Sequence, residues 1–358
     1  MSSEEHVEDQ GVRPEGISPK NLTRLKILGI ILTLSGLGLF LYFIYSVGLH
    51  DILENVEKFG IFGFGVILLI YFMRIVARAS AWRLSVYEPY SLTLRDTIPA
   101  VIIGEAMSSM IPLGILISGT SKAVAVKKKV PLVVGLSSVA TENLFYSLAT
   151  SIFLILGSFT FLRSFNLDEE WILTIDLLIA AIVAVVLFLV LMIVRQWHFA
   201  SAVCEWLYDK GIARRFLDTG RLQVRLFENL IYGYYRRYPR RFLPIFAFET
   251  AFHLLGIVEA WFILSRISDV IPGFLTSFLF ESISRLITIM FKLIPFVIGV
   301  DEAGAQFMSE ILAIGAGIGI TLAIIRKGRI LFWTAIGLVL VIRRGLSLRQ
   351  IRDAGRGI

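Results

Sequence analysis

The stretch ESISRLITIMFKLIPFVIG, residues 281–299, places charged side chains inside a segment that is otherwise apolar enough to enter a bilayer. Its polar members follow at steps of 4, 3 and 4 residues and are Glu281, Arg285, Thr288 and Lys292. On a helix these steps put the first and the last about 20° apart, which predicts one polar stripe ahead of Pro295. Ionised groups at membrane depth cost roughly 3 kcal/mol each or more, so the stripe should face a bundle interior or a wet cavity.

A second interrupted stretch, Ile98–Lys122, has the same plan. The residues that break its apolar run are Glu105, Pro112, Gly114, Gly119 and Lys122. Broken helices at comparable places in two halves of a membrane protein are the usual sequence trace of a substrate site. The two stretches therefore predict that this chain handles a polar or charged group inside the membrane.

The composition agrees with a membrane location. Of the 358 residues 56% are hydrophobic, and the mean hydropathy is +0.77. Runs that approach the length of about 20 residues needed to span a bilayer are Leu25–Val47, Gly60–Val76, Pro131–Phe161, Trp171–Val194, Phe242–Leu264 and Ala303–Ile325. Ile330–Ile342 is short for a span, and its placement stays open. We expect an all-α polytopic protein with about seven transmembrane helices and two re-entrant broken helices.

Several classes of site are disfavoured by the residue types present. The chain has one cysteine, Cys204, and four histidines without ligand spacing, so we expect no metal site. It contains neither a G-x-x-x-x-G-K-[ST] phosphate loop nor an H-E-x-x-H motif, and we expect no cofactor. The net charge of +7 comes from basic loops between spans, which is the ordinary bias of cytoplasmic loops and predicts no nucleic-acid partner.

The distribution of charge predicts the topology. Basic residues before the first span place the N-terminus in the cytoplasm, and the acidic loop Leu49–Phe59 suits the outside. The return to the cytoplasm is marked by Arg74, Arg78 and Arg83. If the stretch Ile98–Lys122 then crossed fully, the lysines that follow it would lie outside, against the rule. A re-entrant hairpin that turns near residues 112–114 keeps them inside.

By the same reasoning the segment Leu275–Gly299 re-enters from the opposite face, so the two elements would form an inverted repeat. The basic residues expected to mark the next cytoplasmic end are Arg326, Lys327 and Arg329. The organisation that follows is a disordered cytoplasmic tail (1–20), a single transmembrane domain (21–345) and a basic C-terminal tail (346–358). The connection 195–241 interleaves arginine with aromatic residues, which is typical of a basic amphipathic segment on the cytoplasmic membrane surface.

Two explanations fit the charged stripe. Either Glu281 and Arg285 form a structural ion pair at i,i+4, or Arg285 and Lys292 present positive charge to a phosphate while Glu281 orients the guanidinium. Glu105 and Lys122 likewise have two explanations. They lie at the interfacial mouth of the first hairpin, where long side chains reach water, or they line the opposite wall of the same cavity.

Three further titratable residues fall within apolar spans. Glu142 lies mid-span, and Glu249 and His253 form an i,i+4 pair. A histidine that is hydrogen-bonded inside the bundle is the simpler explanation, and a proton relay through these three residues is the alternative. For Asp301, next to Glu302, the simpler explanation is an acidic cap at the start of a helix.

Two motifs resemble those of a known family. The run GEAMSSMIPLG, residues 104–114, resembles the GE…P-x-G stretch of the lysylphosphatidylglycerol synthase transmembrane family, whose members are also described as flippase-like. The run PFVIGVDEAG, residues 295–304, resembles that family's P-x-x-x-G-[VL]-x-E-x-G signature. The paired glycines that often accompany each proline are absent here. The motif positions in this chain are Pro112, Gly114, Gly119, Pro295, Gly299, Glu302 and Gly304.

The resemblance implies a lipid translocator of the cell membrane that moves an anionic or phosphate-bearing headgroup through a polar cavity. The residues expected to line that cavity are Glu105, Lys122, Glu281, Arg285 and Lys292. We expect the sequence to be similar to the membrane part alone, without the soluble aminoacyl-transferase domain of the full-length synthases, and hence not to be an enzyme. Expected partners are membrane lipids and a separate synthase or transferase subunit. The alternatives are a membrane-embedded enzyme acting on a lipid or polyprenyl phosphate, and a non-transporting accessory subunit of a lipid or glycan synthase.

Overall fold

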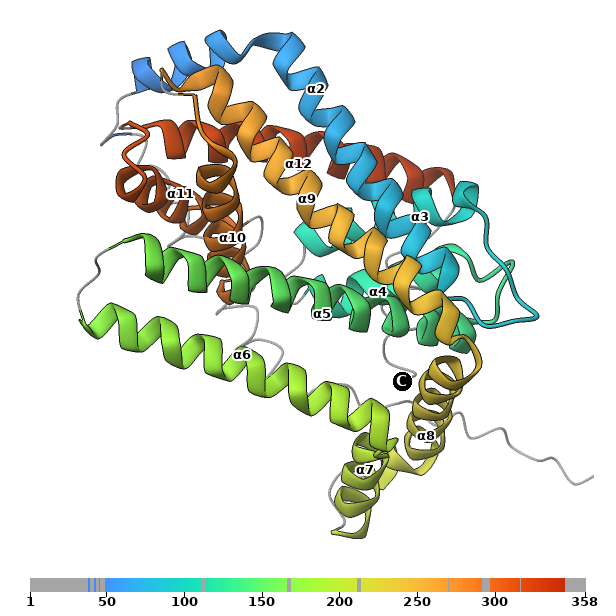
Figure 1. The fold of residues 1–358 in the computed structure, drawn as a ribbon. Helices are drawn as coiled ribbons and strands as arrows, with labels where there is room; N and C mark the ends of the chain where they lie inside the picture. Colours follow the sequence, from blue (N-terminus) through green and yellow to red (C-terminus); the bar gives the residue numbers. More distant parts are fainter. Residues whose placement is uncertain are drawn as a thin grey trace, which may run out of the picture.

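The computed structural model describes residues 38, 42 and 45 and the ranges 49–110, 114–165, 169–210, 214–269, 271–291, 297–315 and 317–344. All regular secondary structure in these ranges is helical, and most of the helices pack into one bundle (Figure 1). The all-α fold expected from the sequence is confirmed.

Among the described residues, four helices make up the first half of the bundle: α2 (Leu49–Leu84), α3 (Leu94–Met110), α4 (Gly114–Ala125) and α5 (Leu132–Ser164). α3 and α4 pack closely, because a Cβ atom at Gly104 of α3 would lie 2.8 Å from the Lys122 side chain and 3.1 Å from the Ser118 carbonyl oxygen of α4. The stretch Ile98–Lys122 therefore folds as a helical hairpin, as predicted. Its turn, with Pro112, lies outside the described residues.

Four more helices make up the second half: α9 (Phe242–Ile267), α10 (Phe274–Met290), α11 (Val300–Ile311) and α12 (Ile318–Arg343). α10 and α11 pack against each other, as α3 and α4 do. The connection between them holds residues 292–296, so Lys292 and Pro295 lie outside the part of the chain that the structure describes.

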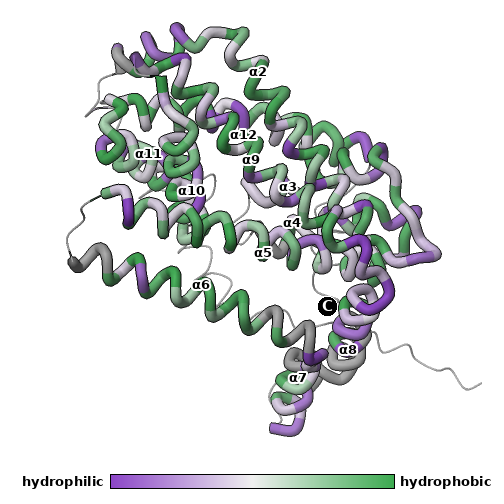
Figure 2. The backbone as a smooth tube through the Cα atoms, viewed as in Figure 1, coloured by the Kyte–Doolittle hydropathy of each residue, from purple (hydrophilic) through white to green (hydrophobic). Residues whose placement is uncertain are grey.

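The two halves are joined by α6 (Glu169–Arg195), α7 (Phe199–Asp209), α8 (Arg214–Arg237) and the short 3₁₀ helix η1 (Pro239–Arg241). α6 is apolar and packs on α5, whereas α8 is largely polar where it is coloured (Figure 2). α7 and α8 form a hairpin in which Ser201 donates a hydrogen bond to Glu228. The hydroxyl of Tyr234 on α8 donates to the Leu84 carbonyl at 2.7 Å, which fixes the hairpin to the end of α2.

The two halves have the same sequence of packed helices. α3 and α10 each have 17 residues, and α4 and α11 each have 12. Within the halves, α2 packs on α3 and α4 on α5, as α9 packs on α10 and α11 on α12. Between the halves, α3 packs on α12, as α10 packs on α5. Exchanging the halves therefore leaves the pattern of helix contacts unchanged.

The two halves run in opposite directions. α2 and α9 lie side by side along much of their length (Figure 1). Near the start of α2 the ring of Phe59 meets that of Phe262, with centroids 6.0 Å apart. Near its end the Leu84 carbonyl accepts a hydrogen bond from Arg241, just before α9. Because α2 and α9 are antiparallel, the halves form the inverted repeat that the charge pattern predicted.

Helix length separates spanning from non-spanning elements. Three helical segments among the described residues are long and apolar enough to cross a membrane, namely Ile52–Leu84, Leu132–Ser164 and Pro239–Ile267. α4 and α11 rise only about 18 Å each, short of a hydrocarbon core of roughly 30 Å. Their length supports two re-entrant elements, while the expected total of about seven spans stays a prediction.

Two expectations about boundaries near the start were wrong. Leu49–Phe59, expected to be an external loop, is helical and continues into the rest of α2 across a kink at Gly60, where φ is 67°. Arg74 and Arg78, expected at a cytoplasmic end, lie inside the bundle and face buried carboxylates. The positive-inside rule misplaced them because it counts basic residues without knowing their depth.

The end of the chain also differs from expectation. Ala303–Ile325 is not one span, because α11 ends at Ile311 and α12 begins at Ile318. Positive φ angles at Ala313, Gly315 and Gly317 reverse the backbone between them. Ile330–Ile342 continues α12, so the basic residues from Arg326 to Arg329 lie within a helix and not in a loop.

Small residues bring the hairpins against the helices that follow them. A Cβ atom at Gly135 of α5 would lie 3.3 Å from the Cβ of Ala123 on α4. In the second half, a Cβ at Gly319 of α12 would lie 2.1 Å from the carbonyl oxygen of Ala305 on α11. Glycine is therefore required at position 319 for α11 and α12 to approach this closely.

We expect Gly319→Ala to destabilise the protein, because a backbone carbonyl cannot move aside as a side chain can. Overpacking typically costs about 1–3 kcal/mol, so the unfolding temperature of the detergent-solubilised protein should fall. Gly65→Ala is the matched control, since nothing lies within 4 Å of its Cβ and alanine favours a helix. Equal unfolding temperatures for the two variants would contradict the close contact between α11 and α12.

Candidate functional site

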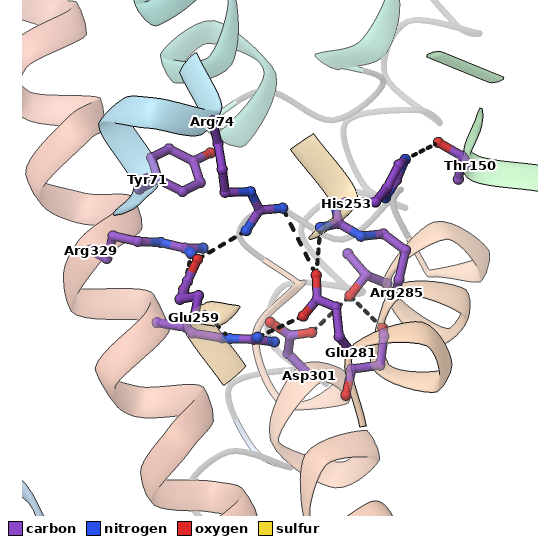
Figure 3. A network of polar contacts seen from close by, with 12 residues as sticks. Tyr71, Arg74, Thr150, His253, Glu259, Glu281, Arg285, Asp301 and Arg329 are labelled. Atoms are coloured by element: carbon purple, nitrogen blue, oxygen red, sulfur yellow. Dashed lines mark hydrogen bonds and ion pairs between the residues drawn. The ribbon is translucent and has the colours of Figure 1, made fainter. Parts of the chain in front are cut away.

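Three arginines from three helices converge on the carboxylate of Glu281 in α10 (Figure 3). Its oxygens lie 2.6 Å from a nitrogen of Arg326 on α12 and 2.9 Å from one of Arg285 on α10. A nitrogen of Arg74 on α2 lies 3.8 Å away. The predicted i,i+4 ion pair is therefore present, but it is one part of a larger buried assembly.

Glu259 of α9 holds the other side of this assembly. It accepts a hydrogen bond from Arg74 at 2.9 Å and another from Arg329 of α12, and Arg326 lies 3.7 Å from it. Arg74 and Arg326 therefore each contact both carboxylates. We call the following six residues the arginine network: Arg74, Glu259, Glu281, Arg285, Arg326 and Arg329.

A glycine on α9 makes room for the network. A Cβ atom at Gly256 would lie 2.6 Å from an oxygen of Glu281 and 3.4 Å from the guanidinium carbon of Arg74. A larger residue there would force the carboxylate and the guanidinium apart. The charged side chains thus come from α10 and α2, and Gly256 on α9 leaves the space that they occupy.

Aromatic rings cover the guanidinium faces that carboxylates do not reach. The guanidinium carbon of Arg74 lies 4.2 Å from the centre of the Phe252 ring, and that of Arg329 lies 4.1 Å from the centre of the Tyr71 ring. Planar guanidinium groups are weakly hydrated and stack favourably on such rings. These contacts help to offset the loss of water around the buried charges.

The arginine network has an excess of positive charge. Four arginines face two glutamates, which leaves two formal positive charges in excess. The side chain of Arg285 is 19% exposed, whereas that of Arg74 is 3% exposed. Arg285 is therefore the most accessible cation of the six residues.

The start of α11 adjoins the network. The acidic cap expected of Asp301 is made by Glu302 instead, which accepts from the backbone N–H of Gly299 at 2.7 Å. Asp301 instead accepts from Thr288 of α10 at 2.9 Å, and Lys327 of α12 lies 2.9 Å from Glu302. Gly299 has a φ of 84°, which glycine adopts readily.

A second buried cluster joins α2, α4 and α5. Glu142 of α5 accepts from Arg78 of α2 at 2.8 and 3.1 Å and from Lys122 of α4 at 3.2 Å. Glu249 of α9 interacts electrostatically with all three. We call these four residues, Arg78, Lys122, Glu142 and Glu249, the Glu142 cluster.

His253 lies one turn from Glu249 but does not bond to it. Its Nε2 lies 3.0 Å from the hydroxyl of Thr150, and its ring stacks between Tyr146 and Phe153. This environment agrees with a hydrogen-bonded bundle histidine, and its part in a proton relay stays a prediction. Within the described ranges, no group of three His, Cys, Asp or Glu side chains is arranged to hold a metal ion.

Comparison with known families identifies the family of this chain. Residues 26–337 match the family described as Lysylphosphatidylglycerol synthase TM region, so the match includes both halves of the repeat and both buried clusters. The chain belongs to this family. Neither the curated proteins nor the solved structures gave a match to the sequence.

In this member of the lysylphosphatidylglycerol synthase TM region family, the predicted cavity residues are divided between two places. Glu281 and Arg285 belong to the arginine network. Glu105 borders it, since its carboxylate accepts from the Tyr71 hydroxyl at 2.9 Å. Lys122 belongs to the Glu142 cluster and is 1% exposed, so it does not lie at an interfacial mouth.

The sequence reasoning missed most of the network's partners. The charge pattern predicts cytoplasmic ends at Arg74, Arg326 and Arg329, and it assigns no role to Glu259. A usable signal existed, because Arg74 and Arg78 are four residues apart and Arg326 and Arg329 three apart. Basic residues that recur at helical spacing within an apolar run indicate a buried face.

We expect Glu281→Ala to destabilise the protein strongly, since it leaves three arginines without their shared carboxylate. Removing one partner of a buried ion pair costs about 3–5 kcal/mol. The control is Glu54→Ala, which breaks an exposed pair with Lys58 of the kind that contributes about 0–1 kcal/mol. Unfolding temperatures in detergent measure both, and a Glu281→Ala variant as stable as Glu54→Ala would contradict the geometry described.

Proposed function

We propose that this protein moves an anionic lipid between the leaflets of the cell membrane, and that the arginine network is the site for the headgroup phosphate. The observation that carries the proposal is the charge of the network, in which four arginines share two carboxylates. A phosphate group bears one or two negative charges and would balance the excess positive charge. The acyl chains would stay in the lipid while the headgroup passes through the bundle.

Arg285 is the residue best suited to meet the phosphate first. It is the most exposed arginine of the network, and its guanidinium matches phosphate oxygens in a two-pronged geometry. If Arg285 leaves Glu281 to bind a phosphate, that carboxylate keeps Arg326 at 2.6 Å and Arg74 at 3.8 Å. The headgroup could then bind without leaving a buried carboxylate unpaired.

The inverted repeat supports a transport role. In transporters of this kind, a site between two inverted halves can open to either side by movement of one half against the other. Here the short hairpins α3–α4 and α10–α11 come from opposite halves and both pack next to helices that carry the network. We propose that these hairpins open and close the site.

The proposal assigns no chemical step to the membrane part. Both glutamates of the network already face two or more arginines, so neither is free to activate a water molecule or a hydroxyl. Any modification of the lipid would then fall to a separate synthase or transferase partner. The lipid itself is the ligand that the network would recognise.

The connection α7–α8 supports an orientation. Trp197 and Trp206 are about half exposed, and Lys210 packs over the Trp206 ring at 4.0 Å. Aromatic and basic side chains together favour the surface of an anionic leaflet. We propose that this hairpin and the N-terminus lie on the cytoplasmic side.

Reconstitution into liposomes tests the proposed function. Wild-type protein should accelerate the movement of a fluorescent phosphatidylglycerol between leaflets, and Arg285→Ala should slow it by about tenfold or more, because a hydrogen bond to a charged group contributes about 1.5–3 kcal/mol. Arg285→Lys should keep part of the rate, since it retains the charge but not the two-pronged geometry.

Lys292→Ala, on the charged stripe of the sequence, should also slow the movement of phosphatidylglycerol between leaflets.

The matched control is Arg163→Ala, which removes an exposed arginine near the end of α5, where it packs over Phe159. Its rate should equal that of wild type. Absence of lipid movement with folded wild-type protein, or a normal rate in Arg285→Ala, would contradict the proposal.

A further inference from the structure

Glu249 of α9 is a buried carboxyl group without a hydrogen-bond donor. It is 0% exposed, and among the described residues no donor group bonds to its oxygens, although Glu142 lies close enough for a carboxyl–carboxylate hydrogen bond when one of the two is protonated. Glu142, Glu259 and Glu281 are buried as well, but each accepts hydrogen bonds from arginine or lysine. An ionised carboxylate in such a place is costly unless it is paired, whereas a protonated one is much less so.

The charged groups that face Glu249 come from several helices. They are Arg78 of α2, Lys122 of α4 and Glu142 of α5. On its own helix, His253 lies one turn away, and its Nδ1 atom has no hydrogen-bond partner in the part of the chain that the structure describes. From α10, Arg285 approaches the same region across the Phe252 ring, whose centre lies 5.6 Å from its guanidinium carbon.

The charge of the Glu142 cluster depends on one proton. With Glu249 ionised, two cations face two carboxylates and the cluster is neutral. With Glu249 protonated, Arg78 and Lys122 face Glu142 alone, which leaves one positive charge. Because Glu142 already bonds to both cations, the proton changes the charge without breaking a hydrogen bond that the structure shows.

The Glu142 cluster and the arginine network are in contact. Arg74 and Arg78 lie one turn apart on α2. Arg74 belongs to the arginine network, and Arg78 belongs to the Glu142 cluster. The ring of Phe252 meets both, with its centre 4.2 Å from the Arg74 guanidinium carbon and 5.7 Å from that of Arg78. A positive charge gained at the cluster therefore acts on an anion at the network over a short, buried path, where screening is weak.

We propose that Glu249 binds a proton that crosses the membrane together with the anionic headgroup. This inference rests on the proposed function and adds its energy source. The carboxylate takes the proton from water on the side where the headgroup enters and returns it to water on the other side. Because proton and anion bind with opposite charge, each favours the binding of the other, and the coupling is reciprocal.

Infrared difference spectroscopy tests proton binding without any transport. Protein in nanodiscs is titrated from alkaline to acidic pH, and the carbonyl stretch of a protonated carboxyl group is followed. Wild type should gain a band that Glu249→Gln lacks, and the matched control Glu205→Gln, on the exposed part of α7, should keep it. A band that persists at every pH, or one that survives in Glu249→Gln, would overturn the proposal.

Transport measurements test the coupling. In liposomes with choline as the only other cation, the rate of phosphatidylglycerol movement should rise by up to about tenfold per pH unit of acidification on the side of entry, as one linked proton requires. Glu249→Gln mimics the protonated form, so its rate should not vary with pH. A wild-type rate independent of pH, or an equal pH dependence in Glu249→Gln, would contradict the coupling.

The two experiments separate the inference from the function on which it rests. If the infrared band behaves as expected and no lipid moves, Glu249 binds a proton and the transport proposal fails. If lipid moves at a rate independent of pH, the transport proposal holds and the inference fails.

Discussion

The carboxylate of Glu281 is the contact on which the bundle depends. It lies at the centre of α10, buried, and faces arginines of α2, α10 and α12. Charges inside a bilayer must be paired, so separating these helices is costly unless another anion, such as a lipid phosphate, replaces the lost carboxylate partner. The position of four helices, including α9 with Glu259, therefore follows from pairing six charged side chains. The apolar surfaces of these helices pack around the buried arginine network.

The inverted repeat gives the two halves one scaffold and different charges. α2 and α5 are joined by Arg78 and Glu142, while α9 and α12 are joined by Glu259 and the arginines of α12. In the first half the arginine of this ion pair lies on the first helix, α2, and in the second half the arginines lie on the last helix, α12. The first half contributes three of the four residues of the Glu142 cluster, whereas Glu249 and five of the six residues of the arginine network come from the second half.

Much of the fold could be predicted from the sequence. Proline and glycine within apolar runs marked both hairpins, and charge at i,i+4 marked Glu281 and Arg285. The partners of these residues could not be found in this way, because Arg74 and Arg326 come from distant helices and look like ordinary flanking charges. The break between α11 and α12 was also hidden, because Gly315 and Gly319 resemble a close-contact motif inside one span. In each case the missing quantity was depth in the bundle, which one sequence does not contain.

The most direct test is an experimental structure of the protein in nanodiscs that contain phosphatidylglycerol. The account predicts a lipid phosphate within hydrogen-bond distance of Arg285, with Glu281 still held by Arg326. Lipid only on the outer surface of the bundle, with Arg285 still paired to Glu281, would contradict it.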